Sequence, residues 1–151
     1  MPRIPCEVIN LFSEALAPFV SVSVVSKSPP IRCGALALID TGSPYTGLSP
    51  KEVLKSRIRM KGAKGKPLRL AGQKFVASPL SGARLNFLTE DGDVLSFDFD
   101  RMTAFIPTKT DSDTLKEVQS IPTIIGTDFL ETFGLALYFD AKSQIAYLEA
   151  P

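Results

Sequence analysis

The segment from Ala35 to Pro50, ALALIDTGSPYTGLSP, runs from five apolar residues into an aspartate, Asp40, and then into turn-forming residues. The apolar run predicts a strand that ends at the aspartate. Aspartate, glycine and serine also build simple turns, because short polar side chains bond nearby backbone groups and glycine adopts positive φ. Taken alone, Asp40–Ser43 therefore fits both a surface turn and a catalytic loop.

The residues on both sides of this segment predict a strand pair and a helix. Valine alternates with serine in Phe19–Val25, the period of a half-buried strand, so an antiparallel pair with Gly34–Ile39 is expected. After the turn, Ser49 at the N-cap, Pro50 at the first helical position and Glu52 at the third form a capping box. A short helix is therefore expected there.

The middle of the chain predicts antiparallel hairpins. Residues 67–78 suggest two short strands around Gly72–Gln73, where glycine suits the first central position of a type II′ turn. Residues 83–100 suggest a second hairpin with Asp91–Gly92 at its turn and apolar residues alternating on either side. Residues 108–120 are polar and predict a surface loop, with one helical turn after Asp113.

The C-terminal part predicts one more strand, a helix and a final hairpin. Thr123–Ile125 reads as an apolar strand, and Gly126 joins it to a short helix that ends at Gly134. Two further strands flank Asp140–Ser143. Because 151 residues suit one compact core, we expect a single mostly-β domain over residues 1–151, with two or three short helices.

Composition excludes several kinds of site. The net charge is +1, histidine is absent, and Cys6 and Cys33 are not in a C-x-x-C motif, which excludes a Cys/His metal site and a histidine-based triad. No metal or other cofactor is expected. The basic residues of Lys51–Lys66 predict a solvated face, and no nucleic-acid partner is expected. Without an apolar run of about 20 residues, we expect a cytoplasmic protein with reduced thiols and no membrane partner, although a Cys6–Cys33 disulfide stays open.

Three segments together resemble the retropepsin-like aspartic peptidases, the single-lobed, retroviral-type branch of the pepsin fold. They are LALIDTGSPYTGLS around Asp40, the hairpin at Gly72–Gln73 in the position of the family's flap, and IIGTDFLETFGLALYFD from Ile124 onward. The resemblance implies a closed β-barrel with a flap over a peptide-binding cleft. It also implies that the strand leading to Gly126 passes close behind the loop that carries Asp40.

The resemblance makes Asp40 the catalytic acid and assigns supporting roles to the next three residues. Thr41 would brace the same loop of a partner chain, Gly42 would let the backbone approach the carboxylate, and Ser43 would bond the outer carboxylate oxygen. The remaining implied site residues lie in the second segment and the flap: Ile124, Ile125, Gly126, Ala71, Gly72, Gln73 and Phe75. For Phe75, core packing stays open as an alternative to substrate contact.

Amide hydrolysis by carboxyl groups needs one ionised group to take a proton from water and one protonated group to polarise the carbonyl. Two carboxyls about 3 Å apart share one proton, because both cannot be charged there. The chain has one Asp-Thr-Gly-Ser motif, so the second carboxyl must come from an identical copy across a two-fold axis. The sequence therefore predicts a homodimeric aspartic endopeptidase that acts on peptide or protein substrates.

The resemblance leaves the dimer contacts open. Thr127 stands where retroviral members often have an arginine that supports the dimer, so other residues must supply the interface. Residues 1–18, an N-terminal extension relative to the family, and the last strand at Gln144–Glu149 are candidates, because terminal strands would otherwise be free sheet edges.

Two other functions stay open. A non-catalytic dimerisation or peptide-binding module would keep the fold without turnover, and an unrelated β-barrel would hold Asp40 in a coincidental turn. The other acidic residues are assigned structural positions: a solvated strand face for Asp98 and Asp100, a loop for Asp111 and Asp113, and a helix N-cap for Asp128 with Glu131.

Overall fold

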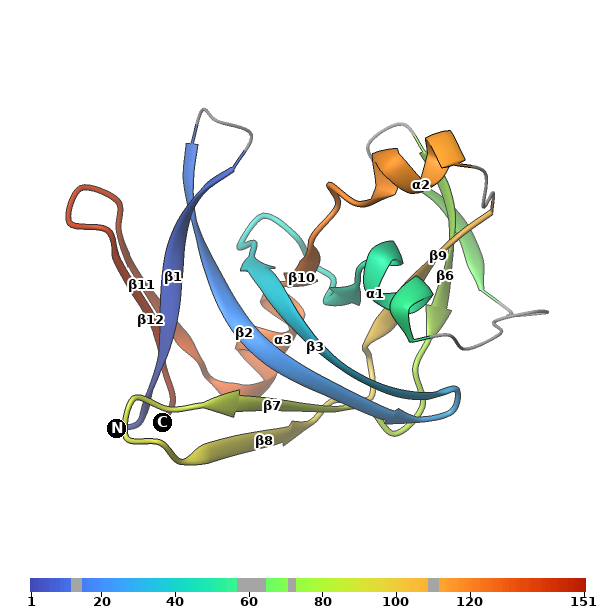
Figure 1. Cartoon of the computed structure of the whole chain (residues 1–151). Helices are drawn as coiled ribbons and strands as arrows, with labels where there is room; N and C mark the ends of the chain where they lie inside the picture. The colour runs from blue at the N-terminus through green and yellow to red at the C-terminus, as the bar shows by residue number, and fades with distance from the viewer. Residues whose placement is uncertain (12–14, 57–64, 71–72, 109–111) are drawn as a thin grey trace.

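The computed structural model describes residues 1–11, 15–56, 65–70, 73–108 and 112–151, and the chain folds mainly as β-structure (Figure 1). The strands are β1 (Arg3–Leu11), β2 (Ala15–Lys27), β3 (Pro30–Ile39), β4 (Gly47–Leu48), β5 (Lys66–Leu70), β6 (Gln73–Pro79), β7 (Arg84–Leu88), β8 (Val94–Asp98), β9 (Thr103–Pro107), β10 (Thr123–Ile125), β11 (Ala136–Asp140) and β12 (Ile145–Glu149). The helices are α1 (Pro50–Lys55), α2 (Ser112–Val118) and α3 (Thr127–Phe133).

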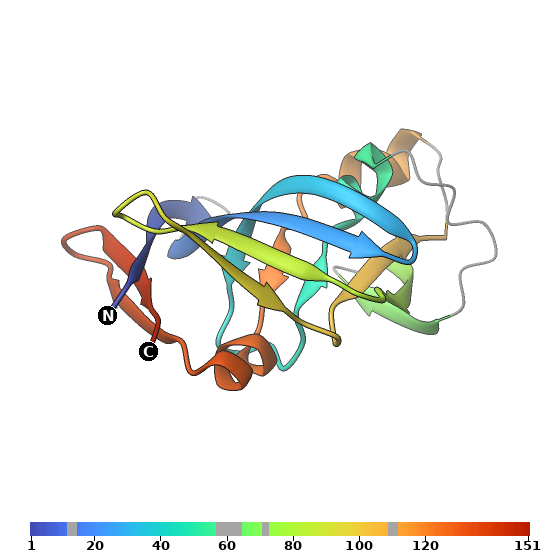
Figure 2. The same cartoon turned by 90° about the horizontal axis from the view of Figure 1, so that it is seen from below.

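The strands form one open sheet, so the expected closed barrel is wrong. The order is β11-β12-β1-β2-β3-β10-β4-β9-β6-β5, and the path does not return to its start. The sheet branches at the 13-residue strand β2. The first part of β2, up to Phe19, pairs with β1, and its later residues Ser23–Val25 pair with β7. Figure 2 shows β7 lying along β2 with β8 beyond it. The hairpin β7–β8 thus extends the sheet sideways instead of closing it.

The pair β2–β3 is the central element and confirms the expected antiparallel pairing. Its register runs from Phe19 opposite Leu38 to Lys27 opposite Pro30. On β2, Val20, Val22 and Val24 are buried, while Ser21 and Ser23 between them are exposed. The two-residue period therefore directs one face of the strand into the core.

The described residues among 1–18 form β1 and the start of β2. The first part of β1 pairs with β12, and the second part, Glu7–Leu11, pairs with β2. β12 also pairs with β11, which is the outer strand at this end of the sheet. The two terminal strands therefore pair with each other inside one chain and are not free edges. That these segments contribute to a dimer interface stays a prediction.

The predicted hairpins form, with one shift in register. The hairpin β7–β8 is confirmed, with Leu88 opposite Val94 and Gly92 at φ 87° in the turn. In β5–β6, Gln73 pairs with Leu70, so Gln73 lies in the strand and not at the turn as predicted. Ala71 and Gly72, the residues between them, lie outside the described residues. Much of the polar segment expected as a loop forms α2 instead.

The helices α1 and α3 begin and end near the predicted residues. The hydroxyl of Ser49 accepts the backbone N–H of Glu52, which confirms the cap of α1. Gly134 ends α3 in the left-handed conformation at φ 64°, as glycine readily does. α3 joins the core through aromatic side chains, whose ring centroids lie 4.7–6.1 Å apart: Phe87, Phe97, Phe99, Phe129 and Phe133. Among the described residues, no helix is long and apolar enough to cross a bilayer.

Candidate active site

Asp40 lies where two strands distant in sequence run side by side. β10 pairs in parallel with the end of β3, with Ile124 opposite Leu38 and Ile125 opposite Ile39. Beyond this pair, the backbone N–H of Asp40 donates to the carbonyl of Ile125 at 3.0 Å. The sequence-predicted residues Ile124, Ile125 and Gly126 are therefore brought next to the Asp40 loop.

The loop after Asp40 is a tight turn held by its own polar groups. The N–H of Gly42 donates to Asp40 Oδ1 at 2.9 Å, and the N–H of Ser43 donates to the Asp40 carbonyl at 3.1 Å. Asp40 is partly buried, while Thr41 and Gly42 are exposed. The backbone thus approaches the carboxylate at Gly42, and Thr41 faces outward beside it.

Ser43 has a different role from the one that the resemblance implied. Its hydroxyl donates to the carbonyl of Tyr45 at 2.9 Å and accepts the N–H of Tyr45 at 3.2 Å. These bonds stabilise the turn that follows the aspartate. In this structure Ser43 therefore shapes the loop, and its hydroxyl is directed to Tyr45 and not to the outer carboxylate oxygen of Asp40.

The Gly126 segment packs directly against this loop. The carbonyl of Ser43 accepts the N–H of Thr127 at 2.8 Å and the Thr127 hydroxyl at 3.2 Å. A Cβ atom on Gly126 would lie 2.7 Å from the Ser43 carbonyl oxygen and closer still to that of Tyr45. Only glycine lets the two segments approach this closely, because those neighbours are backbone atoms.

Asp128 has a structural role, but it is not the N-cap of α3, as we had predicted. Gly126 is the N-cap of α3 and makes no side-chain cap bond. The Asp128 carboxylate instead accepts the hydroxyl of Thr46 at 2.7 Å and the N–H of Phe129 at 2.8 Å. Thr46 is completely buried. No local pattern indicated its role, since a threonine in a turn is ordinary.

A hollow of about 670 Å³ opens beside the loop that carries Asp40. Tyr45 from the loop forms part of its wall, and β5, β6 and β9 supply most of the rest. The lining is mainly apolar, with one cationic side chain: Tyr45, Gly65, Lys66, Pro67, Ala77, Pro79, Thr103 and Phe105. Sequence reasoning missed these residues, because no local pattern indicates which residues of separate strands face the same hollow.

The two predicted flap residues that the structure describes, Gln73 and Phe75, are not among the residues that line this hollow. Phe75 is fully buried, so it packs in the core and presents no surface to a bound peptide. Gln73 begins β6, and Ala71 and Gly72 lie outside the described part of the chain. Of the two roles left open for Phe75, core packing is therefore the one that this structure shows.

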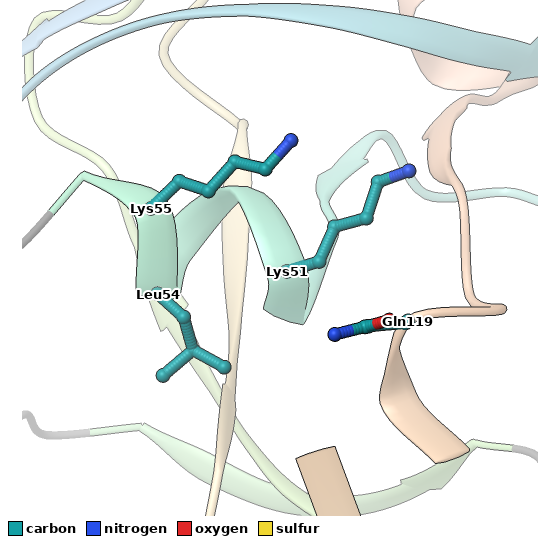
Figure 3. A pocket seen from close by; sticks show the side chains of 4 residues that line it. All are labelled: Lys51, Leu54, Lys55 and Gln119. Carbon is teal, nitrogen blue, oxygen red and sulfur yellow. The ribbon is translucent and has the colours of Figure 1, made fainter. Parts of the chain in front are cut away.

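A second hollow, of about 520 Å³, is lined by α1 and the residue that follows α2. Figure 3 shows the ammonium ends of Lys51 and Lys55 pointing the same way, with Leu54 and Gln119 beside them. None of these four side chains can act as a general base or nucleophile at neutral pH in the way that a carboxylate can. The hollow beside Tyr45, on the loop that carries Asp40, is therefore the better candidate for a reaction site.

The two cysteines are free. Burial raises the pKa of Cys6 to about 12, and burial with a smaller effect of Glu52 raises that of Cys33 to about 11. Both thiols are therefore protonated at neutral pH and are poor nucleophiles. Within the described ranges, no group of three or more His, Cys, Asp or Glu side chains is arranged to hold a metal ion.

Three of the acidic residues that were assigned structural positions, Asp98, Asp100 and Asp113, are exposed. Asp98 pairs with Arg84 at 2.7 Å, and the hydrogen bond from Arg84 lowers the pKa of its exposed carboxyl. Asp100 is exposed, and Asp113 is exposed in the first turn of α2. Asp111 lies outside the described residues.

Comparison with known proteins identifies the fold. No family model matches the chain, and neither does any curated protein. Among solved structures, the chain is similar to a retropepsin-like aspartic protease from Rickettsia conorii, with 12% identity and a TM-score of 0.53. The alignment covers 97% of this chain and 89% of that one. The chain therefore shares its fold, over nearly its whole length, with a retropepsin-like aspartic protease.

Proposed function

We propose that this protein is an aspartic endopeptidase that acts as a two-fold homodimer. The observation that carries the proposal is the position of Asp40, partly buried in a turn that is bonded to the Ile125–Thr127 segment at both Asp40 and Ser43. The fold shared with a retropepsin-like aspartic protease supports it. A simple surface turn would need no second segment bonded behind it.

The chemistry requires two carboxyl groups, and each chain offers one Asp-Thr-Gly-Ser motif. In the proposed dimer, the two Asp40 carboxyls share a proton across the axis. The ionised carboxyl takes a proton from water as the water attacks the scissile carbonyl carbon. The protonated carboxyl donates to the carbonyl oxygen, which gives a tetrahedral diol. The carboxyl that took the proton of water then gives it to the nitrogen as the C–N bond breaks, and a diol hydroxyl returns its proton to the other carboxyl, which restores the singly protonated pair. Exposed Thr41 would meet its counterpart beside the axis.

The β11–β12 hairpin supports a dimer on the side of the molecule where the Asp40 loop lies. Figure 1 shows the tip of this hairpin and the turn after β3 on the same, upper side of the view. Tyr138, Phe139 and Ile145 are 45%, 38% and 51% exposed near that tip. Among the described strands, β11 pairs only with β12, so a second copy can cover apolar surface and pair a strand at its other edge.

The mainly apolar hollow next to Tyr45 supports a peptide substrate. Its walls of proline, phenylalanine and tyrosine suit a large apolar side chain, and Lys66 adds a positive charge. We propose extended peptides with large apolar residues flanking the scissile bond as the substrates.

The test is cleavage of a peptide library by the purified protein and by its Asp40→Asn variant, with Asp100→Asn as an exposed control. We expect cleavage by the wild type and the control, and none by Asp40→Asn, whose fold and melting temperature stay close to the wild type. A statine-type transition-state mimic should raise the melting temperature of the wild type and of the Asp100→Asn control, but not that of Asp40→Asn. Cleavage by Asp40→Asn at the wild-type rate would disprove the proposal. An inert wild type that dimerises and binds peptides would favour the non-catalytic module.

A further inference from the structure

We propose that Asp128 is a positioning residue for the Asp40 loop and that it acts through the hydroxyl of Thr46. This inference rests on the proposed peptidase function. It goes beyond that function because it assigns part of the active-site geometry to a second acidic residue, which touches neither the substrate nor the reacting atoms.

The hydroxyl of Thr46 links Asp128 to the Gly126 turn. Thr46 Oγ1 donates to Asp128 Oδ1 at 2.7 Å and accepts the N–H of Gly126 at 3.0 Å. The direction of both bonds is fixed, because a backbone N–H can only donate and the hydroxyl proton must then go to the carboxylate. Thr46 is fully buried, so water cannot replace either partner without a rearrangement.

Each bond that Asp128 makes in this contact uses the carboxylate as an acceptor. Oδ1 accepts the Thr46 hydroxyl and the N–H of Phe129, and Oδ2 accepts the N–H of Thr46 at 3.3 Å. An ionised carboxylate offers only acceptors and meets this set of three donors. An asparagine can keep the two bonds at Oδ1, but its NH₂ group would face the N–H of Thr46.

These bonds hold the far end of the catalytic loop. Asp40 is bonded to Ile125 and Ser43 to Thr127, and both contacts involve backbone groups of the loop. The Thr46–Asp128 contact is the next connection along the loop and depends on two side chains. The Thr46 carbonyl also accepts the N–H of Thr103 at 3.3 Å, but that bond joins the loop to β9 and not to the Gly126 turn. Without the Asp128 contact, the loop loses this side-chain link to α3, and the carboxylate of Asp40 can shift relative to the Gly126 turn.

A second chain of bonds fixes Asp128 itself. The carbonyl of Asp128 accepts the Thr132 hydroxyl at 2.7 Å, and Thr132 Oγ1 accepts Arg101 Nη2 at 2.6 Å. The first turn of α3 is thereby tied to the segment between β8 and β9. The backbone of Asp128 is thus held within its own helix, while its carboxylate bonds the loop it supports.

A merely structural carboxylate at the start of α3 is the competing explanation. An acidic residue in the first helical turn stabilises a helix through its dipole, whatever the catalytic loop does. The two roles differ in their predictions. A helix-stabilising role changes the melting temperature only, whereas a positioning role changes the turnover of folded enzyme and needs Thr46.

The experiment compares full-length wild type with Asp128→Asn, Asp128→Ala, Thr46→Ser, Thr46→Val and the double variant Thr46→Val/Asp128→Ala. Glu131→Ala, which changes an exposed acid on the same helix, is the matched control. Steady-state kcat and KM are measured on one cleavable peptide, well below each variant's melting temperature. Amide hydrogen exchange at Asp40, Gly126 and Thr127 gives a readout that needs no activity.

We expect Asp128→Ala and Thr46→Val each to lower kcat by about 100-fold, the scale of a misplacement near 1 Å, with a much smaller change in KM. Asp128→Asn and Thr46→Ser retain the central bond and should recover most of that loss. Because the two side chains act as one unit, the double variant should lose no more than either single variant. Exchange at Asp40 and Gly126 should accelerate at least about tenfold in Asp128→Ala, while Glu131→Ala resembles wild type.

The inference is overturned if Asp128→Ala lowers the melting temperature but keeps the wild-type kcat, or if the losses at Thr46 and Asp128 simply add. It is also overturned if exchange at Asp40 is unchanged in Asp128→Ala. If the wild type cleaves no peptide, the proposed function fails by itself, and the exchange rates with the double-variant stability cycle still decide whether Asp128 holds the loop.

Discussion

The backbone N–H of Asp40 donates to the carbonyl oxygen of Ile125 at 3.0 Å, just beyond the parallel pair of β3 and β10. This bond fixes the aspartate at the point where a strand from the first third of the chain meets one from the last third. The carboxylate therefore sits on a rigid base formed by two strands, and the polar bonds of its turn set its direction.

Gly126→Ala should destabilise the protein and abolish its activity. The new Cβ would press on the carbonyl oxygens of Tyr45 and Ser43, and backbone atoms cannot move aside cheaply. We expect a loss of about 1–3 kcal/mol in the free energy of unfolding, measured by urea denaturation.

Gly34→Ala is the matched control. A Cβ at Gly34 meets no atom within 4 Å, so the change should be neutral or add about 0.4–1 kcal/mol of stability. Equal destabilisation by both substitutions would show that close packing behind the Asp40 loop is not what requires glycine at position 126.

The cleavage rate should have a bell-shaped dependence on pH, with its maximum on the acidic side of neutrality. One proton shared by two Asp40 carboxyls makes the singly protonated pair the active form, so the rate falls when the pair gains or loses a proton. Initial rates between pH 3 and pH 8, on a peptide without ionisable groups near the scissile bond, measure this profile. A rate that rises steadily to pH 8 would instead indicate a base that works alone.

Ile145→Asp should weaken the homodimer. Ile145 is 51% exposed on the β11–β12 hairpin, and a second copy covering it would have to bury the new carboxylate. We expect at least about a tenfold increase in the dimer dissociation constant by sedimentation velocity, with a parallel loss of activity at low protein concentration.

Val94→Asp is the control for this surface change. Val94 is 62% exposed at the start of β8, away from the proposed interface, and its substitution should leave dimerisation unchanged. If Ile145→Asp dimerised as tightly as Val94→Asp, the dimer would have to use another face.

The stability of the protein should fall as the pH rises from about 9 toward 11–12. Burial raises the pKa of Cys6 to about 12 and that of Cys33 to about 11, from an ordinary value of 9.0. Above pH 9 the unfolded chain releases these protons while the folded chain retains them, so unfolding becomes more favourable. Below pH 9 the thiol contribution is constant.

Urea denaturation at pH 8, 9 and 10 measures this effect. The double variant Cys6→Ala/Cys33→Ala, which has no thiol to titrate, should lose less stability over this range than wild type, whatever its stability at pH 8. Equal slopes in the two proteins would contradict the raised thiol pKa values.

Local patterns in the sequence determined the individual elements. The alternation of valine and serine in β2, the cap at Ser49 and the glycine at Gly134 each act within a few residues, and each element formed where expected. The strands and turns at Asp40 and at Ile125–Gly126 were predicted for the same reason, whereas the resemblance to a known family implied that the two segments lie together.

The tertiary structure decided how these elements join. The period of a strand sets which face is buried but does not name its neighbour, so the pairing of β1 with β12 and the branching of the sheet at β2 could not be read locally. The bond between Thr46 and Asp128 likewise exists only once β3 and β10 lie side by side. Only the three-dimensional packing brings these two ordinary polar residues into contact behind the Asp40 loop.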